Sequence, residues 1–169
     1  MRTQLKIDGT LQDVEIKNGE IIIIKESKKM TGWERLVLNT TYCTNIDGET
    51  QYITEFNEIN DDQRYNLANY FSDGILAEDI LRMQTLQRQM FRWQAENDVP
   101  VDLTQDVVAK WYIQYDTENQ NLTTEATKWR ISPFLPYFTS EEKASECILA
   151  FEKELTWLFT EFKWRMDTE

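Results

Sequence analysis

The sequence contains no histidine. Paired carboxylates are therefore the remaining side chains whose spacing could suit catalysis or cation binding. The lack of histidine excludes Ser-His and Cys-His nucleophiles and histidine-ligated metals. Glu58 with Asp61 and Asp62 could hold a divalent cation, yet the segment lacks the central glycine and terminal glutamate of a calcium loop. Glu141 and Glu142 could form an acid-base pair, but they fall in an expected first helical turn, where the helix dipole favours acids. We therefore expect no catalytic residue, metal or cofactor. The alternative is an enzyme that acts through carboxylates or a metal ion.

A dense run of acids is the strongest signal for binding. Between Asn45 and Ile80 the chain carries nine carboxylates and one base, Arg64, a net charge of −8 within a total of −12. Such a field repels nucleic-acid phosphates and anionic lipids and attracts basic protein surfaces. Solubility alone is the alternative explanation. The predicted partner-binding residues are Asp47, Glu49, Glu55, Glu58, Asp61, Asp62, Asp73, Glu78 and Asp79.

Aromatic and basic residues give a weaker signal for nucleic acid. The pairs Tyr70-Phe71 and Tyr137-Phe138 could stack on bases, but they lie in acidic surroundings, whereas backbone binding needs a basic track. We expect their rings to fill the core instead. The aromatic-basic cluster consists of Arg82, Arg88, Arg92 and Trp93. Its three arginines do not share one helix face, so we expect no direct nucleic-acid binding.

Cysteine spacing and hydropathy indicate the cellular compartment of the protein. Cys43 and Cys147 are far apart and outside any Cys-x-x-Cys spacing, so buried thiols are expected rather than a disulfide or a zinc site. No run of about 18 apolar residues occurs, and the N-terminus lacks a basic stretch followed by an apolar one. These features predict a cytoplasmic protein.

The N-terminal segment 1–28 predicts a three-stranded antiparallel meander. Its strands are expected at Thr3–Ile7, Leu11–Ile16 and Glu20–Glu26, with hairpin turns at Asp8-Gly9 and Asn18-Gly19. The run Ile21–Ile24 is apolar on both faces, so the rest of the chain or a second copy is expected to cover it. The polar residues 27–32 predict a connector after the meander.

The rest of the chain, 33–169, predicts two repeats, 33–108 and 109–169, in one compact domain. Tyr70-Phe71 recurs as Tyr137-Phe138, and each pair precedes a helical apolar pattern. In the first repeat we expect strands at Trp33–Ile46 and Glu49–Phe56 that turn at Asp47-Gly48, a loop at 57–63, a short strand at Arg64–Phe71 and a helix at 72–96. The apolar face expected for this helix consists of Leu76, Ile80, Met83, Leu86, Met90 and Trp93. In the second repeat we expect strands at Ala109–Asp116 and Leu122–Ile131, and a helix that Thr139 and Glu142 cap as a capping box.

The predicted fold class is α+β, with the meander followed by two hairpin-strand-helix repeats and the helices packed on antiparallel sheet. A homodimer could form through Ile21–Ile24 or through the aromatic end of the last helix, Trp157–Trp164.

The repeat also carries a family resemblance. The residues concerned are Trp33-Glu34-Arg35, Arg64-Tyr65, Asn69-Tyr70-Phe71-Ser72, Tyr112–Asp116, Tyr137–Glu142, Ala144 and Ile148. At these positions the chain resembles small uncharacterised proteins encoded by phages, prophages and other mobile elements of Gram-positive bacteria. Members of that group often have glycine where this chain has Ala68. The resemblance implies a genetic setting in which accessory proteins frequently act on host proteins, CRISPR nucleases and other defence enzymes included.

Charge and resemblance together predict a non-enzymatic accessory protein of a phage or mobile element that binds a protein partner through its acidic surface. The expected effect is inhibition of a host nucleic-acid-processing defence enzyme, in the manner of an anti-CRISPR protein that mimics nucleic acid. A structural or assembly role in the phage particle is a further alternative.

Overall fold

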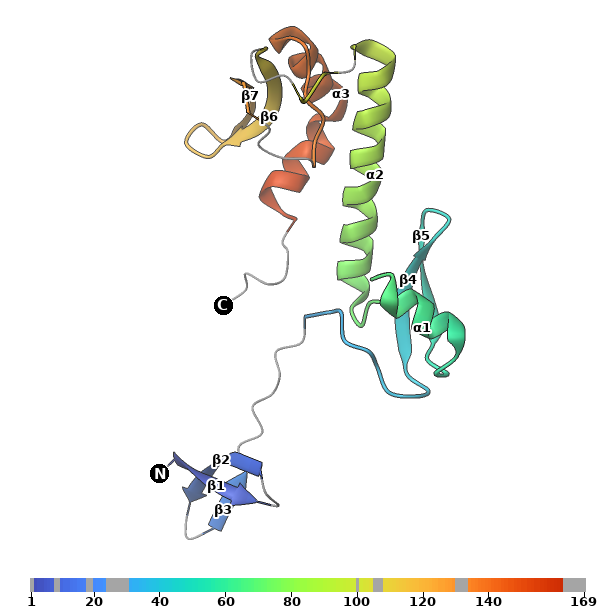
Figure 1. Ribbon diagram of the computed structural model, residues 1–169, viewed down its shortest axis with the longest axis vertical. Helices are drawn as coiled ribbons and strands as arrows, with labels where there is room; N and C mark the ends of the chain where they lie inside the picture. Colours follow the sequence, from blue (N-terminus) through green and yellow to red (C-terminus); the bar gives the residue numbers. More distant parts are fainter. Residues whose placement is uncertain are drawn as a thin grey trace. The chain divides into compact units, whose positions relative to one another are not determined.

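The fold is α+β, as the sequence predicts. The computed structural model describes residues 2–7, 10–17, 20–23, 31–99, 101–104, 108–129 and 134–162 (Figure 1). The chain divides into two compact units, Met1–Met30 and Thr31–Glu169. The described residues contain a three-stranded antiparallel sheet, two antiparallel strand pairs and three helices. None of these helices is long and apolar enough to cross a lipid bilayer.

The N-terminal unit contains one antiparallel sheet of order β1-β2-β3. Its strands are β1 Arg2–Ile7, β2 Thr10–Lys17 and β3 Glu20–Ile23. The end pairs Ile7 with Thr10 and Lys17 with Glu20 set the register on either side of the two connections. The predicted turns at Asp8-Gly9 and Asn18-Gly19 lie outside the described residues.

The second unit begins with a hairpin and a short helix. The strands β4 Thr41–Ile46 and β5 Glu49–Thr54 pair antiparallel, and α1 spans Ile59–Asn66. Asp47 and Gly48 form the turn, both with positive φ. The turn prediction at Asp47-Gly48 is therefore confirmed.

Three predictions for this region are wrong. Residues 33–40 are not a strand, because Thr40 donates its backbone N–H to Val37 and closes a turn there, with Asn39 at a φ of 64°. The predicted loop at 57–63 and strand at Arg64–Phe71 are replaced by α1, and Phe71 makes only a single β-bridge, with Cys43. The sequence of α1 lacks a helical apolar stripe, so periodicity gave no signal for it.

Helix α2, Gly74–Asn97, is the central element of the second unit. Asp73 caps it by accepting a hydrogen bond from the N–H of Leu76 at 3.0 Å. Five residues of its predicted apolar face, Leu76, Ile80, Met83, Leu86 and Met90, are buried, and the sixth, Trp93, is half-buried. Of the five, the first three belong to a core cluster with Cys43 and Phe71, and the last two to a cluster with Ile113 and Phe138. One apolar stripe therefore serves two cores along a single helix.

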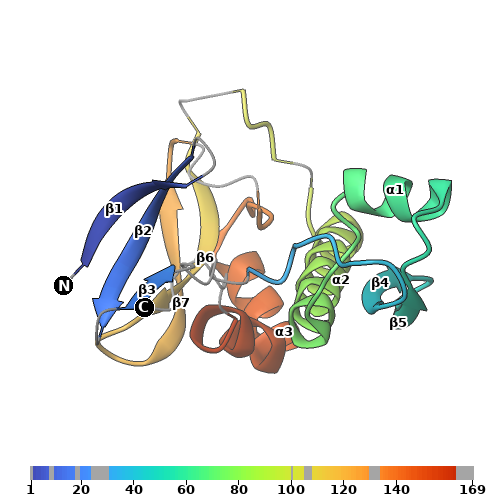
Figure 2. The ribbon, with the colours of Figure 1, turned by 90° about the horizontal axis from the view of Figure 1, so that it is seen from below.

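The last part of the chain packs on the second of these clusters. The strands β6 Lys110–Asp116 and β7 Asn121–Thr127 pair antiparallel, and α3 Glu141–Thr160 packs on both. Figure 2 shows α3 and the β4–β5 hairpin on opposite sides of α2, which contacts both. Within α3, Phe151 departs from helical geometry at a kink.

The predicted cap of α3 is wrong by one residue. The N-cap is Ser140, whose hydroxyl accepts from the N–H of Lys143 at 3.2 Å. Thr139 is unavailable, because its N–H and its hydroxyl both donate to the carboxylate of Asp98. The capping signal therefore locates the helix start, while a long-range contact with the end of α2 decides which hydroxyl is the cap.

Candidate functional site

The nine predicted partner-binding carboxylates do not form one continuous surface. Two of them, Glu55 and Asp61, are 1 % and 3 % exposed, so the structure contradicts their assignment as contact residues. Asp73 is committed to capping α2, and Asp79 is half-buried. The carboxylates that do face solvent are Asp47, Glu49, Glu58, Asp62 and Glu78.

Glu55 is buried because it is the centre of a polar network. Its carboxylate accepts hydrogen bonds from the Tyr70 hydroxyl at 2.8 Å, from the N–H of Asn57 at 2.7 Å and from the Arg35 guanidinium at 3.2 Å. These donors compensate the cost of burying the charge. The Tyr70 hydroxyl in turn accepts from the N–H of Leu36, and burial together with Glu55 raises the pKa of Tyr70. Glu55 therefore joins the segment before β4 to the core.

Asp61 has an equivalent role at the start of α1. It accepts from the Tyr42 hydroxyl at 2.7 Å and from the N–H groups of Phe56 and Glu58, each at 3.1 Å. Burial raises the pKa of Asp61, but these hydrogen bonds and the charge of Arg64 outweigh it and hold the pKa below its ordinary value. Asp61 is thus an ionised structural residue.

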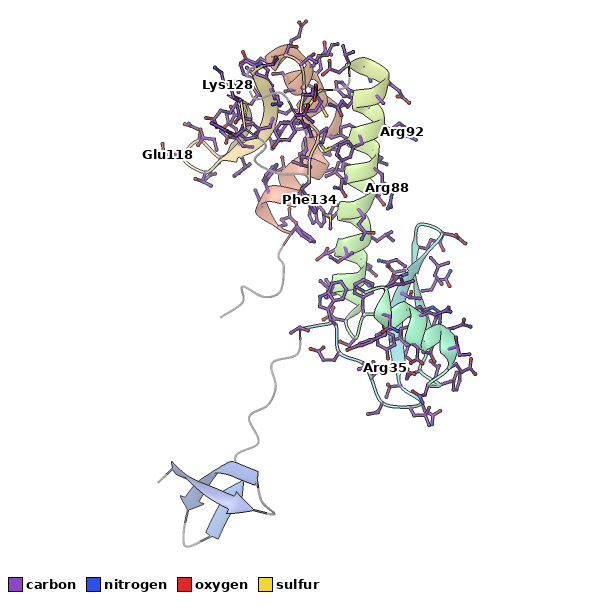
Figure 3. The ribbon with its side chains drawn as sticks, viewed as in Figure 1. Arg35, Arg88, Arg92, Glu118, Lys128 and Phe134 are labelled. Atoms are coloured by element: carbon purple, nitrogen blue, oxygen red, sulfur yellow. The ribbon has the colours of Figure 1, made fainter. Side chains whose placement is uncertain are left out.

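The two networks meet through stacked rings. Tyr42 lies on Tyr70 with ring centroids 3.9 Å apart, and Arg64 donates to the Tyr42 hydroxyl at 2.7 Å. Arg35, which Figure 3 labels, forms ion pairs with the buried Glu55 and with the exposed Asp62. Charged and phenolic groups therefore link residues 35 and 36, the end of β5 and the start of α1.

The exposed carboxylates form two groups. The tip carboxylates, Asp47, Glu49 and Glu78, lie at the hairpin turn and on α2 beside it, and the last two line an open groove of about 530 Å³ together with Arg82 and Glu154. The α1 carboxylates, Glu58 and Asp62, lie beyond the other end of β5. Because β5 has six residues, its length sets the two groups about 20 Å apart.

Arg82, the basic residue among those that line the groove, contacts a buried aromatic ring. The guanidinium of Arg82 lies 3.9 Å from the ring centroid of Trp157, which is 7 % exposed. Because Trp157 is buried in this way, it is not part of a free aromatic face, and the homodimer predicted through Trp157–Trp164 loses its first residue. The last two positions of that range, 163 and 164, lie outside the described residues.

Comparisons of the chain with protein families, with curated proteins and with solved structures gave no match.

The other sequence candidates have structural roles. Tyr70, Phe71, Tyr137 and Phe138 are each at most 4 % exposed, which confirms that their rings fill the core and leaves them unable to stack on bases. Figure 3 shows Arg88 and Arg92 on the side of α2 away from the segment that holds Phe134. Groups of three or more residues placed to hold a metal ion are absent from the described residues.

Both cysteines are free and buried, as the sequence predicts. Burial raises the pKa of Cys147 to about 12, and burial with the charges of Asp73 and Glu78 raises the pKa of Cys43. Because the thiolate is the reactive form, neither sulfur is suited to nucleophilic chemistry at neutral pH.

Sequence reasoning missed the residues that decide which acids are exposed. Glu55 and Asp61 are buried because they contact Arg35, Tyr42 and Arg64. Nothing in the sequence pattern around these two carboxylates distinguishes them from the exposed acids nearby. The available signal was the scarcity of bases. From Trp33 to Ser72 the chain has two, Arg35 and Arg64, and two buried acids to match them.

Proposed function

We propose that this chain is a non-enzymatic accessory protein of a phage or mobile element that binds a basic protein partner in the host cytoplasm through its exposed carboxylates. The proposed consequence is inhibition of a nucleic-acid-processing host enzyme, with a defence nuclease as the favoured target. The carboxylates would occupy positions that nucleic-acid phosphates take on that enzyme.

The observation that supports the proposal is that the bases of segment 33–72 are paired with acids, while several of its carboxylates face solvent. Both of its bases are consumed by ion pairs, Arg35 with Glu55 and Asp62, and Arg64 with Asp61. The exposed charged groups of this segment are therefore carboxylates, Asp47, Glu49, Glu58 and Asp62, of which Asp62 pairs with Arg35. A partner approaching this surface therefore meets a negative potential, which favours lysine- and arginine-rich surfaces and raises their association rate.

We propose further that the two hairpin-helix parts of the second unit are diverged copies of one repeat. In support, the first strand of each hairpin makes a single bridge to the phenylalanine of a Tyr-Phe pair, Cys43 to Phe71 and Trp111 to Phe138. Each phenylalanine is followed two residues later by a helix N-cap, Asp73 or Ser140, and the helix begins at the next residue. On this reading the first copy carries recognition and the second copy carries the better-packed core.

The test is charge reversal at exposed positions only. The variant Glu49→Lys, Glu58→Lys, Glu78→Lys changes three solvent-facing side chains and leaves the buried acids intact. The control Glu96→Lys, Glu118→Lys, Glu152→Lys makes the same charge change at exposed positions elsewhere. Each protein is used to capture partners from a Gram-positive host lysate at low and high salt, with identification by mass spectrometry.

We expect the unmodified chain and the control to retain basic nucleic-acid-binding enzymes, and the first variant to lose them by about tenfold or more in affinity. The captured enzyme is then assayed for nucleic-acid cleavage with and without the unmodified chain. Equal retention by both triple variants at low salt would show that the acidic surface is not the contact.

A further inference from the structure

Apolar side chains gather at the end of segment 33–72 opposite the hairpin turn. Val37, Leu38, Phe56 and Ile59 are 74 %, 57 %, 55 % and 75 % exposed. Single exposed apolar residues are ordinary on protein surfaces, but a group of large ones is not. We refer to these four residues as the apolar end.

Backbone contacts bring the four residues together from three parts of the chain. The turn that holds Val37 and Leu38 is joined to β5's exit, since Asn39 donates to the carbonyl of Glu55 at 2.8 Å. Phe56 is the next residue, and its N–H donates to Asp61 in the first turn of α1. Ile59 is the first residue of α1. The backbone carbonyl of Glu55 and the carboxylate of Asp61 thus hold the chain segments on which the exposed apolar residues lie.

The surroundings of the apolar end are acidic. The α1 carboxylates Glu58 and Asp62 lie in the same turn of chain as Ile59 and are exposed. The neighbouring bases, Arg35 and Arg64, are engaged with Glu55, Asp61 and Asp62. An occupant of this region therefore needs apolar groups for the centre and positive charges for the rim.

We propose that the apolar end is the anchor of the partner interface and that its occupant is a basic protein segment with projecting apolar side chains. This inference rests on the proposed function and adds the anchor to it. Apolar burial supplies the free energy of binding, and the α1 carboxylates orient the partner and select basic sequences.

The charge argues against the other occupants of such a surface. From Trp33 to Ser72 the chain has seven acids and two bases, so a second copy docked there would bring like charges together. Anionic lipid headgroups and nucleic-acid phosphates meet the same repulsion. A basic protein segment is favoured by both the apolar centre and the acidic rim.

The test uses three short fluorescent peptides and the full chain. The first is an amphipathic peptide of lysine, leucine and tryptophan, the second has each lysine replaced by glutamate, and the third has each leucine and tryptophan replaced by serine. Binding is measured by fluorescence anisotropy for the unmodified chain and for Phe56→Ser with Ile59→Ser. The matched control is Trp129→Ser with Leu149→Ser, which removes two side chains that are 70 % and 76 % exposed elsewhere.

We expect the first peptide to bind the unmodified chain and the control equally, and to bind the Phe56→Ser, Ile59→Ser variant about tenfold or more weakly. Peptides two and three should bind weakly to all three proteins. Because the substituted side chains are exposed, thermal unfolding of both variants should match that of the unmodified chain, which excludes misfolding as the cause.

Each contrary outcome has a distinct meaning. Failure of the first peptide to bind, or equal binding of the glutamate peptide, overturns the inference. If the serine peptide binds as well as the first and only the Glu49, Glu58, Glu78 reversal weakens it, the anchor is wrong and the acidic contact of the proposed function stands. Self-association, or binding to vesicles of phosphatidylcholine and phosphatidylglycerol, that is lost in the Phe56→Ser, Ile59→Ser variant overturns the choice of partner.

Discussion

At the scale of single residues, the acids of this chain divide into those that hold the fold and those that face solvent. Glu34 belongs to the first group, because it accepts from the N–H groups of Thr31 and Gly32 and from the Ser72 hydroxyl. Burial raises the pKa of Glu34, but hydrogen bonds from the N–H and hydroxyl of Thr31, from its own N–H and from Ser72 outweigh it and lower the pKa to about 2. Of the Trp33-Glu34-Arg35 motif, the two charged residues are thus both structural.

Tyr70 tests how much the buried network contributes to stability. Tyr70→Phe keeps the ring but removes the hydroxyl that donates to Glu55 and accepts from Leu36, so a buried carboxylate loses a donor and a backbone N–H loses its acceptor. We expect the free energy of unfolding to fall by about 1–3 kcal/mol, measured by urea denaturation. The control Tyr52→Phe alters a ring that is 63 % exposed and should change it by less than about 0.5 kcal/mol. Equal effects of the two substitutions would mean that the network is not a major source of stability.

At the scale of elements, the sequence predicts what periodicity and turn chemistry control and misses what tertiary contacts control. The apolar stripe of α2 and the turn at Asp47-Gly48 are local signals, and both agree with the structure. Helix α1 carries no stripe, because its inward-facing side chains, Asp61 and Arg64, are polar and are satisfied by Tyr42. The candidate site was predicted only in part, because tertiary contacts also determine which acids are buried. Charge density locates the acidic stretch, but contacts with Arg35, Arg64 and the hydroxyls of Tyr42 and Tyr70 hold two of its carboxylates, Glu55 and Asp61, in the interior.

Alanine substitutions at Gly32 and Gly48 can distinguish the cost of backbone strain from the cost of a steric clash. Gly32 and Gly48 have nearly equal φ values, 87° and 86°, so alanine at either position costs about 1–2 kcal/mol in backbone strain. At Gly32 an added Cβ would lie 2.7 Å from Cδ2 of Leu76 in the first turn of α2, whereas at Gly48 it meets nothing within 4 Å. We expect Gly32→Ala to destabilise the protein by about 1–3 kcal/mol more than Gly48→Ala, because the clash adds to the strain. Equal losses in urea denaturation would show that Leu76 moves aside at no cost.

At the scale of the whole molecule, stability is organised around α2. The hairpin β4–β5 packs on α2 near its start, and α3 packs on it as well (Figure 1). Among the residues whose burial the structure describes, the members of both core clusters and the side chains packed against them lie between Trp33 and Phe162. The proposed contact surface lies in the part of this unit that depends most on buried charges, whereas apolar packing dominates around Phe138 and Cys147.

This arrangement predicts that the chain from Thr31 to Glu169 folds without the N-terminal unit. All six tryptophans lie between residues 33 and 164, so tryptophan fluorescence reports the same unit in the full chain and in the shortened one. Because Thr31–Glu169 is a compact unit by itself and the described members of both apolar clusters lie within it, we expect the two melting temperatures to agree within about 3 °C, a difference of less than about 1 kcal/mol. A melting temperature lower by roughly 10 °C in the shortened chain would mean that the N-terminal sheet stabilises the second unit directly. In that case the meander would have to be included in any account of how the acidic surface is held in place.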